Sequence, residues 1–238
     1  MNKSILITGT DFGLGLALVR ESLKQDYTVY ACLYKTAKDN ESIQNLKKEY
    51  GDRLIVIENV DVGDDASVEK AIETLSQYTD KIDVLVNNAA INPDNFQSKL
   101  EDVDVKTALD VLNVNTLGAL RVTKGLVHFI RRGYYKVIIN ISSEAGGLTH
   151  SYRVTGYDYC MSKAALNMLS TMLQTYLKPD GVKVLAVYPG WMQTRMGGSN
   201  AILTTEFAAQ KVLALVPKFH EKYNAPIFMD NEGNPLEW

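Results

Sequence analysis

Thr8-Gly9-Thr10-Asp11-Phe12-Gly13-Leu14-Gly15 is a glycine-rich turn between the apolar segment Ile5–Ile7 and a segment with helical spacing, Leu14–Gln25. Glycine lets the backbone turn tightly and approach a phosphate group without a Cβ in the way. A helix that starts directly after such a turn presents free N–H groups and the positive end of its dipole to that anion. Strand, glycine turn and helix in this order predict a dinucleotide-binding site.

Short apolar segments rich in β-branched residues alternate with helical segments along the chain, and continuous apolarity is typical of strands covered on both faces. The predicted strands are Ile5–Ile7, Thr28–Leu33, Leu54–Ile57, Ile82–Val86, Val137–Ile141, Val182–Val187 and Ile227–Met229. The predicted helices are Leu14–Gln25, Ser42–Tyr50, Ala66–Tyr78, Val103–Arg131, Tyr157–Leu177 and Thr205–Phe219. This alternation predicts an α/β fold: a single doubly wound, Rossmann-type domain over residues 1–238, with a parallel seven-stranded sheet and helices on both faces.

The composition limits the classes of partner. The chain has 238 residues, of which 46% are hydrophobic and 22% charged, and its formal net charge is −3. One domain of this length buries enough surface to need no disulfide or metal. This mildly negative net charge does not favour binding to nucleic acid or to anionic membranes, both of which attract positively charged surfaces. Neither a secretory signal pattern nor a run of about 18 apolar residues is found, so we expect a cytoplasmic protein.

Cysteine and histidine are few and scattered. Cys32 and Cys160 stand far apart, and no histidine lies at metal-ligand spacing from either. We therefore expect two reduced, structural thiols and no metal site.

Tyr159 and Lys163 are four residues apart at the start of the predicted helix Tyr157–Leu177. This spacing puts both side chains on one helix face, where a phenol and an ammonium group can converge. A tyrosine pKa near 10 is too high for acid–base work at neutral pH. A nearby ammonium favours the phenolate, so we expect Lys163 to lower the pKa of Tyr159.

These stretches, taken in order, resemble the short-chain dehydrogenase/reductase family, and in particular its subgroup of C-factor and sniffer-type carbonyl reductases. The resemblance rests on residues 8–15, Asp61-Val62, Asn87-Asn88-Ala89-Ala90, Asn140-Ile141-Ser142-Ser143-Glu144, Tyr159-Cys160-Met161-Ser162-Lys163 and Tyr188-Pro189-Gly190-Trp191-Met192-Gln193-Thr194. Ser143 and Tyr159 are 16 positions apart, a longer loop than many family members have, and the subgroup carries such a loop. The tail Phe228–Trp238 is similar to the ending of that subgroup.

The resemblance implies four catalytic residues. Ser143 would orient and polarise a substrate carbonyl, with Ser142 as the alternative. Tyr159 would exchange a proton with the substrate oxygen, and Lys163 would assist it and bind the nicotinamide ribose. Asn115 would complete a proton relay through water.

The resemblance also implies the cofactor contacts. The expected cofactor-binding residues are Gly9, Asp11, Phe12, Gly13, Leu14, Gly15, Tyr34, Lys35, Asp61, Val62, Asn88, Ala89, Ala90, Tyr159, Lys163, Pro189, Gly190, Met192 and Thr194. Leu33 stands where an acidic residue would hold the adenosine ribose, and Lys35 and Lys38 follow it. A lysine can meet a 2′-phosphate, so NADP is favoured over NAD. Phe12 stands where NADP-specific members of the family often carry a basic residue, so NAD remains an alternative cofactor.

The function implied is an oxidoreductase that transfers a hydride between the nicotinamide cofactor and a small carbonyl or alcohol substrate. Two alternatives remain: a dinucleotide-binding signalling protein of C-factor type with little turnover, and an interaction module that keeps only the fold. Turnover and cofactor binding distinguish the three.

Aromatic residues flank the predicted site and suit an apolar or aromatic carbonyl. The candidates for the pocket wall are His150, Tyr152, Tyr157 and Trp191. The segment Gly197–Thr204 is too short for an elaborate lid, so we expect an open, permissive site. Family dimers pack through helices equivalent to Val103–Arg131 and Tyr157–Leu177, which implies a homodimer or homotetramer. Met168, Met172 and Leu173 could serve that face or the core.

Overall fold

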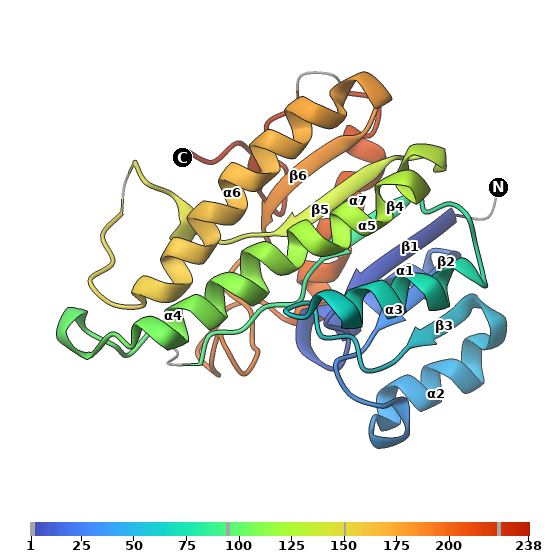
Figure 1. Cartoon of the computed structure of the whole chain (residues 1–238), viewed down its shortest axis with the longest axis horizontal. Coiled ribbons are helices and arrows are strands. Elements are labelled where there is room, and N and C mark those ends of the chain that lie inside the picture. Colours follow the sequence, from blue (N-terminus) through green and yellow to red (C-terminus); the bar gives the residue numbers. More distant parts are fainter. Residues whose placement is uncertain (1–2, 94–95, 150, 223–224) are drawn as a thin grey trace.

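The computed structural model describes residues 3–93, 96–149, 151–222 and 225–238. Within these residues, seven strands form one sheet in the order β3-β2-β1-β4-β5-β6-β7 (Figure 1). The strands are β1 (Lys3–Thr8), β2 (Tyr27–Cys32), β3 (Leu54–Ile57), β4 (Val84–Asn87), β5 (Val137–Ile141), β6 (Lys183–Tyr188) and β7 (Phe228–Asp230). Every neighbouring pair is parallel, which confirms the predicted doubly wound sheet.

Helices cover both faces of the sheet (Figure 1). One face carries α1 (Gly13–Lys24), α2 (Glu41–Tyr50) and α7 (Thr205–Phe219). The other carries α3 (Asp65–Ser76), α5 (Gly118–Arg132) and α6 (Tyr157–Leu177), with α4 (Val105–Leu112) packed against α6. Successive strand residues point to opposite faces: Ile5 and Ile7 pack with α1, whereas Leu6 packs with α5. Both faces of β1 are therefore buried, as its continuous apolarity indicates.

The predicted helix Val103–Arg131 is helical from Val105 to Arg132, but it is not one regular α-helix. A short 3₁₀ turn, Leu100–Asp102, comes first, and α4 and α5 are then separated by a π-helical turn, Asn113–Leu117. Apolar spacing on both sides of the π turn resembles that of one continuous helix, so the sequence pattern does not reveal the break. Such turns are frequent at functional sites, and this one holds Asn115. The other predicted elements agree with the structure to within two residues at their ends.

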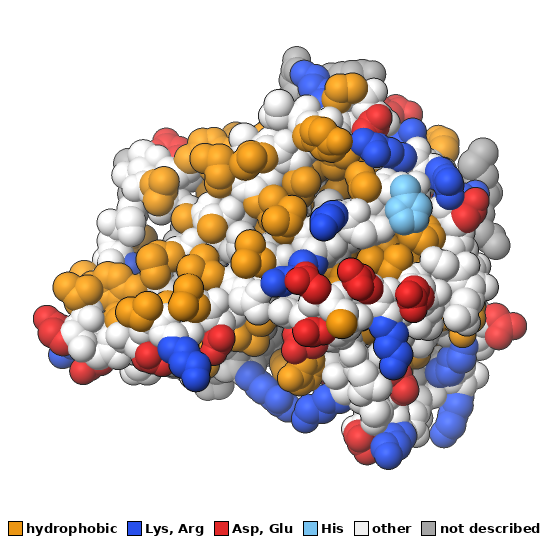
Figure 2. All heavy atoms as spheres, in the orientation of Figure 1, with side chains coloured by type: hydrophobic (Ala, Val, Ile, Leu, Met, Phe, Trp, Pro, Cys, Tyr) orange, Lys and Arg blue, Asp and Glu red, His pale blue; other side chains and the backbone are white. Residues whose placement is uncertain are grey.

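Exposed apolar side chains gather over α4, α5 and α6 (Figure 2). They include Leu109, Leu117, Leu120, Met161, Met168 and Met172. Met168 and Met172 are therefore surface residues, whereas Leu173 packs against the core. In the part of the chain that the structure describes, no helix has the length and apolarity needed to cross a membrane.

Candidate active site

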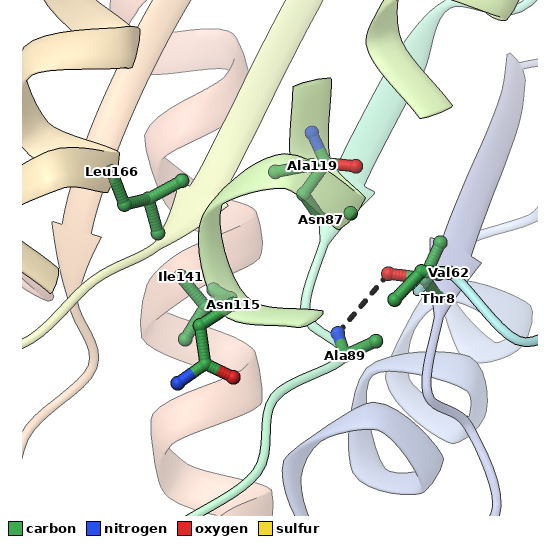
Figure 3. Close-up of a pocket in the computed structure, with 9 residues that line it drawn as sticks. Thr8, Val62, Asn87, Ala89, Asn115, Ala119, Ile141 and Leu166 are labelled. Carbon is green, nitrogen blue, oxygen red and sulfur yellow. Dashed lines mark hydrogen bonds between the residues drawn. The ribbon is translucent and has the colours of Figure 1, made fainter. Parts of the chain in front are cut away.

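The glycine turn is fastened to the end of β4. The Thr8 hydroxyl accepts hydrogen bonds from the backbone N–H groups of Asn88 and Ala89, at 3.0 and 3.1 Å, and Figure 3 shows the second of these. The Asn88 side chain donates in return to the carbonyl oxygens of Thr8 and Gly9, at 2.9 and 3.0 Å. The structure thus brings the predicted Asn88-Ala89 pair against the predicted phosphate-binding turn, at the carboxyl edge of the sheet.

The turn leaves no room for a side chain at Gly9 or at Gly15. Gly9 has a φ of +68°, and a Cβ on it would lie 2.8 Å from the Cα of Ala89. A Cβ on Gly15 would lie 2.1 Å from the carbonyl oxygen of Gly9. Phe12 precedes α1 with extended backbone, and among the described residues no side chain caps this helix. The first N–H groups of α1 are therefore available to an anion, so the residues fit the pyrophosphate of a dinucleotide.

Asp11 braces the chain that follows β2. Its carboxylate accepts hydrogen bonds from the backbone N–H groups of Tyr34 and Lys35, at 2.8 and 3.0 Å. The side chains of Tyr34, Lys35 and Lys38 are exposed, and neither lysine forms an ion pair within the described residues. Two free ammonium groups therefore stand where a cofactor ribose phosphate is expected.

Asp61 and Val62 follow β3 on the same edge of the sheet. The Asp61 carboxylate accepts the backbone N–H of Gly63 at 2.8 Å, and Val62 is buried. A Cβ on Gly118 would lie 2.7 Å from the Val62 side chain, so α5 can approach this closely only with glycine at that position. The expected adenine contact of Asp61 stays a prediction.

The two serines after β5 have different surroundings. The Ser142 hydroxyl is buried and donates to the side-chain oxygen of Asn167 in α6, at 2.6 Å. The Ser143 hydroxyl accepts the backbone N–H of Ala145 at 3.1 Å and donates to the Glu144 carboxylate at 2.7 Å. Because Ser142 is held by α6, Ser143 is the better candidate for the catalytic serine, as the sequence predicts.

Tyr159 and Lys163 lie in the first turns of α6, beside Ser143. The Lys163 Nζ atom is 5.4 Å from the centre of the Tyr159 ring and donates to the carbonyl oxygen of Ile141 at 2.8 Å. Both side chains are buried, with 7% of Tyr159 and 2% of Lys163 exposed. Burial lowers the pKa of Lys163 to about 8. The pair therefore converges on one face of α6, as the spacing predicts.

The pKa of Tyr159 departs from the prediction. Burial, followed by the negative charge of Glu144, raises it above its ordinary value, and a hydrogen bond with Ser143 and the charge of Arg153 oppose the rise. The prediction of a lowered Tyr159 pKa is therefore wrong in this structure, because the loss of hydration on burial raises the pKa by more than the favourable interactions lower it. Tyr159 is therefore a protonated phenol at neutral pH.

Asn115 joins the π turn to two other segments. Its side-chain oxygen accepts the Ile91 N–H at 2.8 Å, and its amide nitrogen donates to the Ile91 carbonyl and to the Ser162 hydroxyl, both at 3.0 Å. These bonds go to Ile91 and Ser162 rather than to Lys163. Beside them is a cavity of about 10 Å³, lined in part by Thr8 and Asn115 (Figure 3), which is roughly the room that one water needs. The relay through water stays a prediction.

A larger pocket, of about 540 Å³, opens beside Ser143 and Tyr159. Two of the predicted aromatic residues, Tyr152 and Trp191, line it, whereas Tyr157 does not. The predicted contact of His150 lies outside the described residues. The segment expected to hold the nicotinamide forms the other side of the pocket, through Pro189, Gly190, Met192 and Thr194.

That segment folds back on itself and reaches the glycine turn. Gly190 has a φ of +94°, and the Trp191 indole donates to the carbonyl of Gly197 at 2.8 Å. The Thr194 hydroxyl accepts the N–H of Gly197 at 3.0 Å. A Cβ on Gly13 would lie 3.6 Å from the Thr194 methyl group, so the two predicted cofactor segments lie side by side.

Five residues that line the pocket were not predicted from the sequence as site residues. They are Phe96, Glu144, Arg153, Tyr188 and Met196. Glu144 follows Ser143 directly, and Arg153 lies in the loop whose extra length the sequence shows. Glu144 and Arg153 could have been predicted, because each is a charged residue in a segment already assigned to the substrate side of the site. Phe96 and Met196 carry no such signal.

Comparison with known proteins agrees with this geometry. The model of the short chain dehydrogenase family matches residues 3–202. The chain is 32% identical over 160 residues to C-signal of Myxococcus xanthus, which covers 67% of this chain and 95% of that protein. Some curated relatives are longer: the chain spans 54% of the mitochondrial D-beta-hydroxybutyrate dehydrogenase of Mus musculus, at 34% identity over 193 residues.

Two solved structures superimpose over the whole chain. The carbonyl reductase Sniffer of D. melanogaster gives a TM-score of 0.91 at 27% identity, covering 100% of both chains. The NADPH-bound carbonyl reductase from chicken fatty liver gives a TM-score of 0.89 at 26% identity, covering 100% of this chain and 99% of that one.

Proposed function

The chain belongs to the short-chain dehydrogenase family of NAD(P)-dependent oxidoreductases, and from this premise we propose that it transfers a hydride between NADP(H) and a small carbonyl or alcohol substrate. One observation carries the proposal: Ser143 and Tyr159 line one pocket together with Thr194, which lies against the glycine turn, and the Lys163 ammonium group lies 5.4 Å from the centre of the Tyr159 ring. We further propose that the whole chain acts as one dinucleotide-binding and catalytic domain, in the cytoplasm.

The protein's residues would position the reactants and supply the proton. The bound nicotinamide supplies or accepts the hydride. Ser143 holds the substrate oxygen, and Tyr159 donates its proton as negative charge develops on that oxygen. Lys163 places a positive charge 5.4 Å from the tyrosine ring, where it stabilises the phenolate that remains. Tyr159 is protonated at neutral pH, so it can donate a proton to the oxygen of a carbonyl substrate.

Charge around the adenosine end supports NADP over NAD. Leu33 after β2 provides no carboxylate for a ribose hydroxyl, and the free ammonium groups of Lys35 and Lys38 follow it. The Arg195 guanidinium stacks over the Phe12 ring, 4.3 Å from its centre. A cation therefore stands beside the turn although Phe12 itself is apolar. The chicken protein at 26% identity is described as NADPH-bound, which agrees with this choice.

The pocket favours an apolar or aromatic carbonyl compound. Phe96, Tyr152 and Trp191 offer aromatic surface, and Trp191 is 48% and Tyr152 79% exposed. A half-open wall of this kind accepts substrates of several shapes. We therefore expect activity over a panel of aromatic aldehydes and ketones rather than with one compound.

A signalling role with little turnover is the second candidate, because the chain covers 95% of a relative named C-signal. The retained set of Asn115, Ser143, Tyr159 and Lys163 favours turnover, since a protein that only binds a dinucleotide has no need of the buried Tyr159–Lys163 pair. The rate of turnover with saturating cofactor separates the two candidates.

We propose that two copies associate through α5 and α6. Leu120, Met168 and Met172 expose apolar surface on these helices, and Leu117 does so in the π turn before α5, in the region where Figure 2 shows several groups of hydrophobic side chains. An exposed apolar area of this kind marks an interaction surface. A homodimer covers it, and a homotetramer requires a second surface in addition.

The proposed function is tested by consumption of NADPH and NADH with a panel of uncharged aromatic and aliphatic aldehydes and ketones. Turnover with several carbonyl compounds, faster with NADPH, supports it. Tight binding of NADPH without turnover of any compound favours the signalling candidate. Failure to bind either cofactor would leave only the fold in common with the family's enzymes.

A further inference from the structure

A circuit of contacts links Ser143 to Tyr159 through three residues that the proposed reaction does not use. The Ser143 hydroxyl donates to one carboxylate oxygen of Glu144 at 2.7 Å, and the other oxygen pairs with the Arg153 guanidinium. Arg153 stacks on the Phe96 ring, 4.9 Å from its centre. The Phe96 ring meets the Tyr159 ring edge to face at 5.0 Å, which closes the circuit.

Glu144 and Arg153 are the charged side chains of this pocket among its described lining residues. Their side chains are 35% and 29% exposed, so solvent screens the pair only in part. The other titratable groups near Tyr159 are Asp158, Cys160 and Lys163. Tyr152 and Tyr188 line the same pocket, and the negative charge of Glu144 contributes to the raised pKa of Tyr188. The pair is thus the charge closest to the reacting groups on the substrate side.

The hydrogen bonds of this circuit have a direction. An ionised carboxylate accepts hydrogen bonds and donates none. The single hydrogen of the Ser143 hydroxyl therefore points to Glu144. A hydrogen bond with Ser143 also favours the phenolate of Tyr159, so Glu144 and Tyr159 compete for the single Ser143 hydrogen. The Glu144 carboxylate thus directs the Ser143 hydrogen away from Tyr159, and its negative charge also favours the protonated phenol.

We propose that Glu144 is a positioning residue of this reaction, acting through Ser143 and Tyr159, and that Arg153 holds it in place and offsets its charge. The proposal rests on the proposed function, because Ser143 and Tyr159 are the groups through which it acts. An arriving carbonyl oxygen accepts the Tyr159 hydrogen and competes with Glu144 for the Ser143 hydrogen. Within the protein, this step breaks only the O–H bond of Tyr159, and the proton passes to the substrate oxygen.

Two predictions of opposite sign follow. The Glu144 carboxylate disfavours the phenolate of Tyr159, so replacing it with an uncharged residue makes the phenolate easier to form. The Arg153 guanidinium favours the phenolate, so replacing it makes the phenolate harder to form. A role confined to packing would not give shifts of opposite sign.

The test is the pH profile of kcat/KM for alcohol oxidation, because this direction of the reaction needs the phenolate of Tyr159. The profile is measured with saturating NADP on four proteins: the wild type, Glu144→Gln, Arg153→Gln and the double variant. We expect Glu144→Gln to move the profile to lower pH by roughly 0.5–1 unit, which is about three- to tenfold faster oxidation at a fixed pH below the limb. Arg153→Gln should move it to higher pH, and the double variant should lie between the two. Arg153→Lys, which keeps the charge, should restore the wild-type profile.

Shifts in the same direction, or lowered rates with unmoved profiles, would overturn the role of Glu144. The pKa of Tyr159 can also be measured without turnover, from the tyrosinate absorbance of the NADP-bound protein. The absorbance of each variant is compared with that of the same variant carrying Tyr159→Phe, and the difference reports Tyr159 alone. A wild type that binds NADP but oxidises and reduces nothing would refute the proposed function. The absorbance titration would then still decide on Glu144: opposite shifts support its role, and equal or absent shifts overturn it.

Discussion

The Lys163 ammonium group donates a hydrogen bond of 2.8 Å to the carbonyl oxygen of Ile141, at the end of β5. This bond ties the first turns of α6 to the strand from which Ser143 follows. It therefore keeps the tyrosine–lysine pair and the serine in one arrangement, although they come from different elements. Holding an ammonium group in a buried position has a cost, which is visible in its lowered pKa.

Lys163 should make stability depend on pH. Its pKa is about 8 in the folded protein, below its ordinary value of 10.5. Between these two values the unfolded chain binds more protons, so the free energy of unfolding rises with pH in that interval and is lowest below it. We expect the wild type to gain stability relative to Lys163→Met as the pH rises from about 8 to about 10.

Denaturant unfolding of both proteins across that range measures the effect. Tyrosines that ionise at higher pH are common to both proteins, so the difference isolates Lys163. A constant difference at all pH values would show that the lysine is not buried as described.

Lys35 should discriminate between the two cofactors. Its exposed ammonium group is free to meet a 2′-phosphate, which NADPH has and NADH lacks. We expect Lys35→Ala to lower kcat/KM for NADPH by about tenfold and to leave the value for NADH nearly unchanged, with a further loss in the Lys35→Ala, Lys38→Ala double variant. Lys70→Ala, on exposed α3, is the matched control. Equal losses with both cofactors would argue against a phosphate contact.

Gly9 should tolerate no side chain. Gly9→Ala combines a φ of +68° with a Cβ that would lie 2.8 Å from the Cα of Ala89. Gly51→Ala has a similar φ of +55° but has nothing within 4 Å of the new Cβ. We expect the control to lose about 1 kcal/mol of unfolding free energy and Gly9→Ala to lose more, together with NADPH affinity. Chemical denaturation and cofactor fluorescence report the two effects, and equal stability of the two variants would contradict the close approach.

The exposed methionines of α6 should govern association. Met168→Glu places a charge in the apolar area of α5 and α6, and we expect it to shift the protein from dimer to monomer. Tyr78→Glu changes an apolar residue that is 58% exposed away from that area and should leave association unchanged. Light scattering after gel filtration measures the mass of each. A dimeric Met168→Glu protein would place the interface elsewhere.

Much of the fold could be predicted because its signals are local. Buried parallel strands need continuous apolar segments, and the glycine turn needs residues that adopt positive φ, as Gly9 does. The break in the helix before α5 could not be predicted, because a π turn inserts a residue without interrupting the apolar face that holds Asn115. Element order therefore follows from pattern, whereas local geometry within a helix does not.

The site was predictable in its motif residues and not in its pKa values. Tyr159 and Lys163 share a helix face by spacing alone, but how deeply both are buried depends on packing between elements far apart in sequence. Burial reverses the expected direction of the Tyr159 pKa. Glu144 and Arg153 were likewise visible as residues, but their pairing depends on how the loop between them folds back.

The most direct measurement is the rate of carbonyl reduction by Tyr159→Phe at saturating NADPH. Phenylalanine keeps the ring contact with Phe96 and removes the proton that the substrate oxygen needs. We expect kcat to fall at least about 100-fold while NADPH affinity, measured by cofactor fluorescence, stays near the wild-type value. A Tyr159→Phe protein that reduces carbonyl compounds at close to the wild-type rate would contradict the assignment of Tyr159 as the proton donor.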